Sequence, residues 1–253
     1  IRHRFDAPLG PLTLLGADFD RDHAAPGDPI LLTTFWHTKE QPTDDFVLHL
    51  ALLAPDGSPA AEYDLPPTVP WHPTSAWQPG DTWRGQHLLH LPATLDSGDY
   101  TWHLTLISSS TPSPSTHLPS SLSITAPDRT FTPPPVDIET NTRLGNVATL
   151  LGATLAPSPW PLAPGTPLTV TLAWRAEAET HISYHVFLHL IGPDGALVAQ
   201  SDGVPADWTR PTTGWLPGEY VTDARVLALP AGAPAGDYTL SAGLYVPGAE
   251  RLT

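Results

Sequence analysis

The sequence has no cysteine and no methionine among its 253 residues, and its single lysine is Lys39. The absence of cysteine excludes disulfide bonds, thiolate metal sites and cysteine nucleophiles. Basic residues are also scarce, because 11 Lys and Arg stand against 26 Asp and Glu for a formal net charge of −15. A surface of that sign repels phosphate backbones and anionic lipids, so we expect no nucleic acid partner.

Long apolar runs are missing as well. No stretch approaches the roughly 20 apolar residues of a membrane helix, so we expect no direct membrane insertion of this segment. The N-terminus lacks the basic, apolar and cleavage-site succession of a signal peptide. The chain begins Ile1-Arg2-His3 without Met, which is typical of a processed product or of a segment of a longer protein.

An internal repeat is the strongest feature of the sequence. The stretch Pro73-Thr74-Ser75-Ala76-Trp77-Gln78-Pro79-Gly80-Asp81 occurs again, 138 residues later, as Pro211-Thr212-Thr213-Gly214-Trp215-Leu216-Pro217-Gly218-Glu219. Trp36 and Trp174, Pro55-Asp56-Gly57 and Pro193-Asp194-Gly195, and Gly98-Asp99-Tyr100 and Gly236-Asp237-Tyr238 match at the same offset. Repetition at one spacing indicates two copies of one module. We predict a first domain over residues 1–126, with a lead-in over residues 1–8, and a linker plus second domain over residues 127–253.

Each module alternates apolar and polar residues with the period of two that is typical of half-buried strands. The predicted inward faces are Ile30, Leu32, Thr34 and Trp36, with Leu48, Leu50 and Leu52, in the first module, and Leu168, Val170, Leu172 and Trp174, with Val186, Leu188 and Leu190, in the second. The Pro-Asp-Gly triplets predict hairpin turns, and Tyr100 and Tyr238 match the tyrosine corner. Because 32 prolines disfavour helices, the expected fold is all-β: two tandem antiparallel β-sandwich domains, immunoglobulin-like and related by internal duplication.

The connections carry further expectations. Residues 108–116 predict a long hairpin tip before a strand over 118–125, and residues 126–135 predict a linker that Pro133-Pro134-Pro135 makes stiff. Thr253 aligns with Ser115, so the second module ends before a counterpart of the 118–125 strand. The final sandwich is therefore expected to be unfinished, either because a longer tandem array is cut here or because a neighbouring subunit completes the sandwich by adding a strand. The candidate assembly edge comprises Ile1, Arg2, His3, Arg4 and Phe5 at one end and Arg251, Leu252 and Thr253 at the other.

Residues suited to catalysis or metal binding do not form a recognisable set. Asp18, Asp20 and Asp22 have the spacing of a calcium loop, but His23 stands where that loop needs glycine. His87 and His90 face opposite sides of a strand, and His185 and His189 would lie about 13 Å apart. The usual nucleophile, phosphate-binding and zinc motifs are absent. We predict no catalytic residue, no metal site and no cofactor, and we do not expect an enzyme.

Tryptophan is the remaining lead, since the chain has nine. Trp36 and Trp174 have the inward parity of core residues. Trp77 and Trp215, beside Pro-Gly, either plug the end of a sandwich or stack on a sugar. Trp71, Trp83 and Trp208 are expected to be more exposed, and with His72 or Asp207 they could form a platform for a carbohydrate. The candidate ligand-binding residues are Trp71, Trp77, Trp83, Trp208 and Trp215.

Several second-module motifs, taken in order, resemble a known kind of module. They are Leu150-Leu151-Gly152, Pro164-Gly165, Trp174, His189-Leu190, Pro193-Asp194-Gly195, Pro211 to Glu219, Gly236-Asp237-Tyr238 and Gly243 to Leu252. This order resembles tandem β-sandwich modules of bacterial cell-envelope proteins, especially those appended to dolichyl-phosphate-mannose-type membrane glycosyltransferases. The first module departs at Ile107 to Ser110 and has Asp81 in place of glutamate. The resemblance implies an extracytoplasmic accessory module without transfer activity.

Two functions from different classes follow. The leading hypothesis is a non-catalytic, extracytoplasmic structural and interaction protein, a spacer or a repeat of a surface assembly, whose partners are other subunits or neighbouring modules joined head to tail. The alternative is a carbohydrate-binding module that holds a glycan on the loop tryptophans. An enzyme ranks third, because it would need carboxylates that converge in a cleft.

Overall fold

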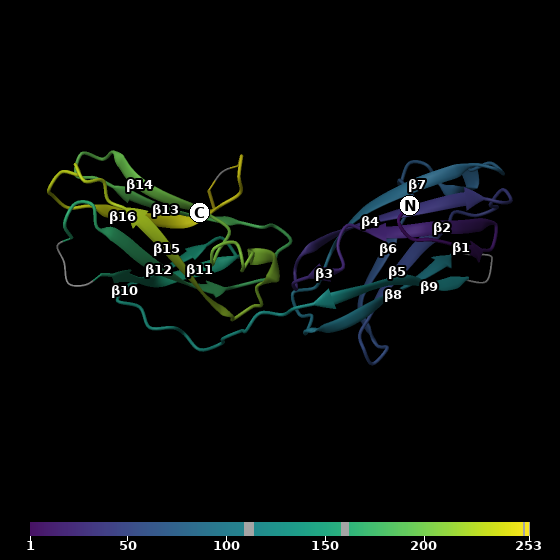
Figure 1. Ribbon diagram of the computed structural model, residues 1–253, viewed down its shortest axis with the longest axis horizontal. Helices are drawn as coiled ribbons and strands as arrows, with labels where there is room; N and C mark the ends of the chain where they lie inside the picture. The colour runs from purple at the N-terminus through teal and green to yellow at the C-terminus, as the bar shows by residue number, and fades with distance from the viewer. Residues whose placement is uncertain (109–113, 158–161, 250, 253) are drawn as a thin grey trace. The chain divides into compact units, whose positions relative to one another are not determined.

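The computed structural model describes residues 1–108, 114–157, 162–249 and 251–252 of the chain, and these are built from strands and loops (Figure 1). The chain divides into two compact units, unit 1 over Ile1–Ala126 and unit 2 over Pro127–Thr253. In the described residues the helical segments are two short 3₁₀ turns, η1 (Thr74–Ala76) and η2 (Thr212–Gly214). The predicted all-β fold of antiparallel sheets is confirmed.

Unit 1 contains two sheets. The first has the order β1-β2-β4-β7 and is formed by β1 (Arg4–Leu9), β2 (Leu12–Phe19), β4 (Pro29–Thr38) and β7 (Thr82–His90). The second has the order β3-β9-β8-β5-β6 and is formed by β3 (His23–Ala24), β9 (Ser115–Ile124), β8 (Gly98–Ile107), β5 (Val47–Leu53) and β6 (Pro59–Leu65). All pairs are antiparallel except the short contact between β3 and β9.

Unit 2 has a closely similar layout. Its first sheet has the order β10-β11-β12-β15 and is formed by β10 (Ile138–Leu144), β11 (Ala148–Ala156), β12 (Pro167–Ala176) and β15 (Tyr220–Ala228). Its second sheet has the order β14-β13-β16 and is formed by β14 (Leu197–Gly203), β13 (His185–Ile191) and β16 (Thr239–Tyr245). The second sheet therefore has no described strand at the place that β9 takes in unit 1. Descent of the two units from one copied module stays an interpretation of the sequence.

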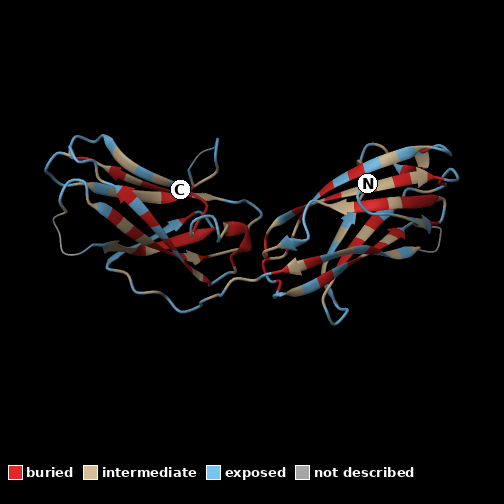
Figure 2. Ribbon diagram, viewed as in Figure 1, coloured by how far each residue is buried: buried red, intermediate tan, exposed pale blue. Residues whose placement is uncertain are grey.

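The inward faces predicted from alternation are buried. Every residue of the two predicted faces in unit 1 is fully buried, and those of unit 2 are at most 4% exposed; Figure 2 shows the alternating buried and exposed bands. The Pro-Asp-Gly turns join β5 to β6 and β13 to β14, as predicted. Both tyrosine corners form, since Tyr100 Oη donates to Asp96 O at 3.0 Å and Tyr238 Oη to Pro234 O at 2.6 Å.

The repeated Pro-Thr-x-x-Trp-x-Pro-Gly stretch is a packing device in both units. Thr212 Oγ1 donates to Ile182 O and accepts from Tyr184 N, so η2 is fastened to the loop before β13. Thr74 makes the same pair of bonds to Asp44 O and Phe46 N. The tryptophan that follows each turn is then held inside the sandwich, where burial of an indole is strongly stabilising.

Three expectations about connections require correction or stay open. Residues 4–9 form the edge strand β1, paired with β2, and not a lead-in. The segment predicted as a linker is held on unit 2, because Thr130 forms a bridge with Tyr220 and Arg129 binds the buried Glu219. A segment that supplies the counter-ion of a unit's buried carboxylate is part of that unit. The tip expected over residues 108–116 falls mainly on residues 109–113, which lie outside the described residues.

Candidate functional site

The five candidate tryptophans do not form one platform. Trp77 and Trp215 are 0% and 1% exposed, so they plug the sandwich ends and are closed to a sugar. Trp83 is half-buried, against the expectation of an exposed ring, because it lies between His72 at 4.5 Å and Trp77 at 5.5 Å. Trp71 in unit 1 and Trp208 in unit 2 are the exposed ones, at 82% and 64%.

Trp208 belongs to a row of rings on the outer face of the β14-β13-β16 sheet. Even-numbered residues of β13 point into the core, so His185 and Phe187 point outward. The Trp208 and His185 ring centroids are 5.3 Å apart and nearly perpendicular. Tyr245, the register partner of His185 on β16, is 5.6 Å from it. We call Trp208, His185, Tyr245 and Phe187 the outer aromatic row.

The backbone that presents Trp208 is strained. Ala206, Asp207 and Trp208 all have positive φ, at 52°, 50° and 68°, a conformation that is uncommon for residues other than glycine and is least strained for Asp and Asn. The turn is held by Ala206 N, which donates to the carboxylate of Asp223 at 2.9 Å, and by Thr209 Oγ1, which donates to Ala206 O at 2.6 Å. Asp223 is itself fully buried.

The Trp208 ring lies with one face against the backbone of Gly203. A Cβ placed on Gly203 would be 3.3 Å from each of three indole atoms, so the ring sits flat where only glycine leaves room. Because Trp208 is nevertheless 64% exposed, the opposite side of the ring is open to solvent. The strained turn and the glycine together fix an exposed indole in one orientation.

At the other end of the row, a charged side chain covers Phe187. The guanidinium of Arg251 lies 4.0 Å from the centroid of Phe187, a cation–π contact that leaves Phe187 only 7% exposed. Beyond it, His189 Nε2 lies 3.5 Å from the carboxylate of Asp202. The accessible rings of the row are therefore Trp208, His185 and Tyr245, with hydrogen-bonding atoms on the last two.

Unit 1 provides an internal comparison for this row. Its β5 and β8 pair in the register that β13 and β16 have, with Val47 opposite Ile107 where His185 is opposite Tyr245. Val47 and Ile107 are both exposed. Because unit 1 forms the same sheet without aromatic side chains at these two positions, the fold does not require them in unit 2.

A second feature of unit 2 is the free edge of β16. In unit 1, β8 pairs with β5 on one side and β9 on the other. In unit 2, β16 pairs with β13, and on its other side the described chain offers only residues 251–252, where Leu252 N donates to Leu244 O at 2.8 Å. Alternate residues of an antiparallel strand direct both backbone groups to the same side. Leu240 and Ala242 therefore direct theirs, like Leu244, to the free edge.

The core beneath this edge is incompletely covered. Tyr100, Trp102 and Leu104 of β8 are at most 4% exposed, because Leu118, Leu122 and Ile124 of β9 close the core beside them. Tyr238, Leu240 and Ala242, the matching residues beside β16, are only partly buried. Within the described residues, unit 2 thus combines a strand edge that is largely without a partner with core side chains that are only partly buried.

The N-terminal segment is not a free donor strand. Arg2 N donates to both carboxylate oxygens of Asp18, and His3 N donates to one of them at 2.9 Å. Burial would raise the pKa of Asp18, but the bonds from these two N–H groups outweigh it and the pKa is lowered. Residues 4 and 5 continue into β1. The expectation that Ile1 to Phe5 complete a neighbour's sandwich is therefore wrong for this arrangement, whereas Arg251 and Leu252 do lie at the β16 edge, and Thr253 lies outside the described residues.

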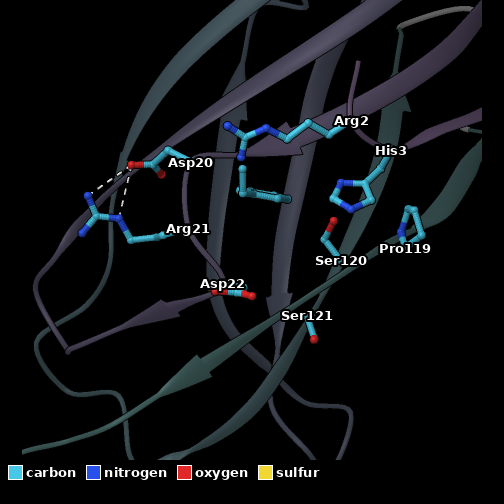
Figure 3. A pocket seen from close by; sticks show the side chains of 9 residues that line it. Arg2, His3, Asp20, Arg21, Asp22, Pro119, Ser120 and Ser121 are labelled. Atoms are coloured by element: carbon cyan, nitrogen blue, oxygen red, sulfur yellow. Dashed lines mark hydrogen bonds and ion pairs between the residues drawn. The ribbon is translucent and has the colours of Figure 1, made fainter.

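A polar hollow of about 330 Å³ lies in unit 1. Figure 3 shows Arg2 and His3 from the N-terminal segment, Asp20, Arg21 and Asp22 from the segment between β2 and β3, and Ser120 and Ser121 from β9. Asp20 accepts from Arg21 and from Leu31 N, and Asp22 contacts His23, whose hydrogen bond lowers the pKa of Asp22. The two carboxylates are thus held by neighbours, and the lowered pKa of Asp22 does not suit a general acid.

Among residues 1–108, 114–157, 162–249 and 251–252, no group of three or more His, Asp or Glu side chains could hold a metal ion. The same residues include no helix with the length and apolar character of a membrane span. Of the three aspartates with calcium-like spacing, Asp18 binds the N-terminal backbone and Asp20 the start of β4.

Of the outer aromatic row, only Trp208 was predicted from the sequence as a candidate site residue. The alternation His185-x-Phe187-x-His189 opposite the inward leucines was a usable signal, since it places aromatic rings on a solvent-facing side of a strand. Nothing local indicates that the Ala206 to Trp208 turn, on a loop more than 20 residues downstream of His185, bends back over that face.

Comparisons with known proteins show only weak similarity. The sequence matches no protein-family model and no curated protein. Among solved structures, the C-terminal domain of wzt is similar at a TM-score of 0.35 and 13% identity, over 49% of this chain and 77% of that one. A DUF4785 family protein of Legionella pneumophila is similar at a TM-score of 0.29 and 13% identity, over 94% and 48%. The native alpha-2-macroglobulin of E. coli has a TM-score of 0.25 at 10% identity, over 94% and 14%.

Proposed function

We propose that the chain is a non-catalytic, extracytoplasmic interaction module: a tandem of β-sandwich units that serves as a spacer or repeat of a surface assembly and accepts an extended strand of a neighbouring protein along β16. One observation carries the proposal. In the part of the chain that the structure describes, the edge of β16 at Leu240 and Ala242 has no strand beside it and lies over a core that is only partly covered, whereas β9 closes the matching edge in unit 1. The resemblance to bacterial envelope modules supports the extracytoplasmic setting and an accessory role.

The chemistry of the partner follows from β9. A strand that runs antiparallel to β16 would pair its N–H and C=O groups with those of Leu240 and Ala242 and would place alternate apolar side chains over the exposed core. In β9 these are Leu118, Leu122 and Ile124, separated by polar residues that face solvent. The partner is therefore an extended segment with apolar residues at alternate positions near its centre.

A synthetic peptide with the sequence of residues 116–125 is the direct probe. Added to the whole chain at millimolar concentration, it is expected to slow hydrogen exchange of the Leu240 and Ala242 amides and to raise the unfolding temperature of unit 2. A peptide with aspartate in place of the three apolar residues is the matched control. Equal exchange with both peptides would contradict the proposal.

The substitution Ala242→Pro is the matched variant of the protein. Proline removes an N–H that points to the free edge and not to β13, and edge strands tolerate it there. We expect the variant to fold with a change of at most about 1 kcal/mol in the free energy of unfolding and to lose the peptide effect. Full retention of the effect would place the peptide elsewhere.

A further inference from the structure

We propose that the exposed end of the outer aromatic row, formed by Trp208, His185 and Tyr245, is a binding site for a neutral glycan. This site lies on the outer face of the sheet and consists of side chains, whereas the proposed strand site uses the backbone edge of β16. A test of one site therefore does not decide the other. It replaces the five-tryptophan platform expected from the sequence, because burial closes Trp77 and Trp215.

The first argument is the strain at Trp208. Non-glycine residues in the left-handed region cost of order 1–3 kcal/mol each and persist where the surroundings impose them. Here three such residues are consecutive, and a fully buried carboxylate, Asp223, holds the first of them. The turn does not bury the indole, since Trp208 stays 64% exposed. Its effect is to fix the orientation of an exposed ring, which favours recognition over packing.

The second argument is the shape of the site. One indole face is against Gly203 and the other is open, while His185 and Tyr245 stand nearly perpendicular to their neighbours at 5.3 and 5.6 Å. A flat apolar surface bordered by ring N–H and hydroxyl groups matches a pyranose, which has C–H groups on its face and hydroxyl groups around its rim.

The third argument is charge. The chain carries a formal net charge of −15, so an anionic ligand is repelled. Of the cations near the row, Arg251 is engaged over Phe187, and Arg225, which donates to Gly203 O, is paired with the buried Asp223. His189 is beside Asp202. What remains at Trp208 and Tyr245 is uncharged and polar, which favours a hydroxyl-rich neutral ligand over a uronic acid or a phosphate.

The test is calorimetric titration of the whole chain with neutral hexasaccharides, namely cellohexaose, maltohexaose, mannohexaose and chitohexaose, and with hexagalacturonate as the acidic probe. At least one neutral probe is expected to bind, and Trp208→Ala is expected to weaken that binding roughly ten-fold or more, since it removes the stacking surface. Trp208→Phe should retain part of the affinity.

Trp71→Ala is the matched control, because Trp71 is the exposed tryptophan that the structure describes in unit 1; it should leave affinity unchanged. Circular dichroism and the unfolding temperature verify that each variant folds. The proposal is overturned if no neutral probe binds at millimolar concentration, if Trp208→Ala binds as the wild type does, or if hexagalacturonate alone binds.

Discussion

At the scale of single residues, the chain uses ordinary apolar side chains for its core, and Ala206 to Trp208 are three consecutive residues with left-handed backbone. Alternation was enough to place the inward residues, because a strand has only two faces. Trp83 shares the inward parity of Leu89 on β7. This parity, and not the expectation of an exposed ring, matches its half-buried position. The surroundings of Trp208 could not be predicted from the sequence, because they depend on a left-handed turn that nothing in Ala206-Asp207-Trp208 indicates.

Ala206→Gly tests the strain directly. Glycine adopts positive φ without the clash of a Cβ, so we expect the free energy of unfolding of unit 2 to rise by about 1 kcal/mol while the bond from residue 206 N to Asp223 is kept. The control is Ala224→Gly at an exposed position of β15, which should instead lower it by roughly 0.5–1 kcal/mol. Urea unfolding measures both; a destabilised Ala206→Gly variant would show that the turn is relaxed.

At the scale of elements, the repeated turn motif has Asp81 in unit 1 and Glu219 in unit 2, and this difference changes what the loop binds. Asp81 Oδ2 accepts from Gln78 N at 2.8 Å, and Glu219 Oε2 accepts from Leu216 N at 3.0 Å, so both carboxylates close the same turn. The longer Glu219 also binds Arg210 at 2.5 Å and Arg129 at 2.6 Å. This is how the segment expected to be a free linker becomes attached to unit 2.

Hairpins and tyrosine corners could be predicted because their signals are local. The attachment of Arg129 could not, since its partner is 90 residues away and the sequence shows only that two charges of opposite sign exist. The open edge of β16 was expected from alignment of the two modules, whereas the donor segment was misassigned, because the bonds of Arg2 and His3 to Asp18 are equally non-local.

Glu219→Gln is expected to destabilise unit 2 by about 3 kcal/mol, because it leaves Arg129 and Arg210 without their buried counter-ion. Asp81→Asn, which loses only part of one backbone hydrogen bond, should cost unit 1 about 1 kcal/mol. Native-state hydrogen exchange of the slowest amides in β12 and β4 gives the two values separately. Equal losses would mean that the arginines contribute nothing beyond the turn itself.

At the scale of the whole molecule, the chain is two sandwiches with separate cores. The core cluster of unit 1 runs from Leu9 to Ile124 and that of unit 2 from Leu144 to Leu244, and they share no residue. Both proposed binding features, the β16 edge and the Trp208 site, belong to unit 2. Unit 1 has its edge closed by β9 and lacks the aromatic row, so the two units differ in the surfaces that they expose.

Separate cores predict separate stabilities. Leu50 and Leu188 are equivalent central residues of β5 and β13, and both are fully buried. Leu50→Ala should lower the stability of unit 1 by about 3 kcal/mol through lost burial and a cavity, leaving the slowest amides of β12 unchanged, and Leu188→Ala should do the converse with β4 unchanged. Because each variant is the control of the other, hydrogen exchange of the pair decides the matter. If either substitution speeds exchange in both units alike, the chain unfolds as one cooperative body, and strand binding at β16 would then stabilise unit 1 as well.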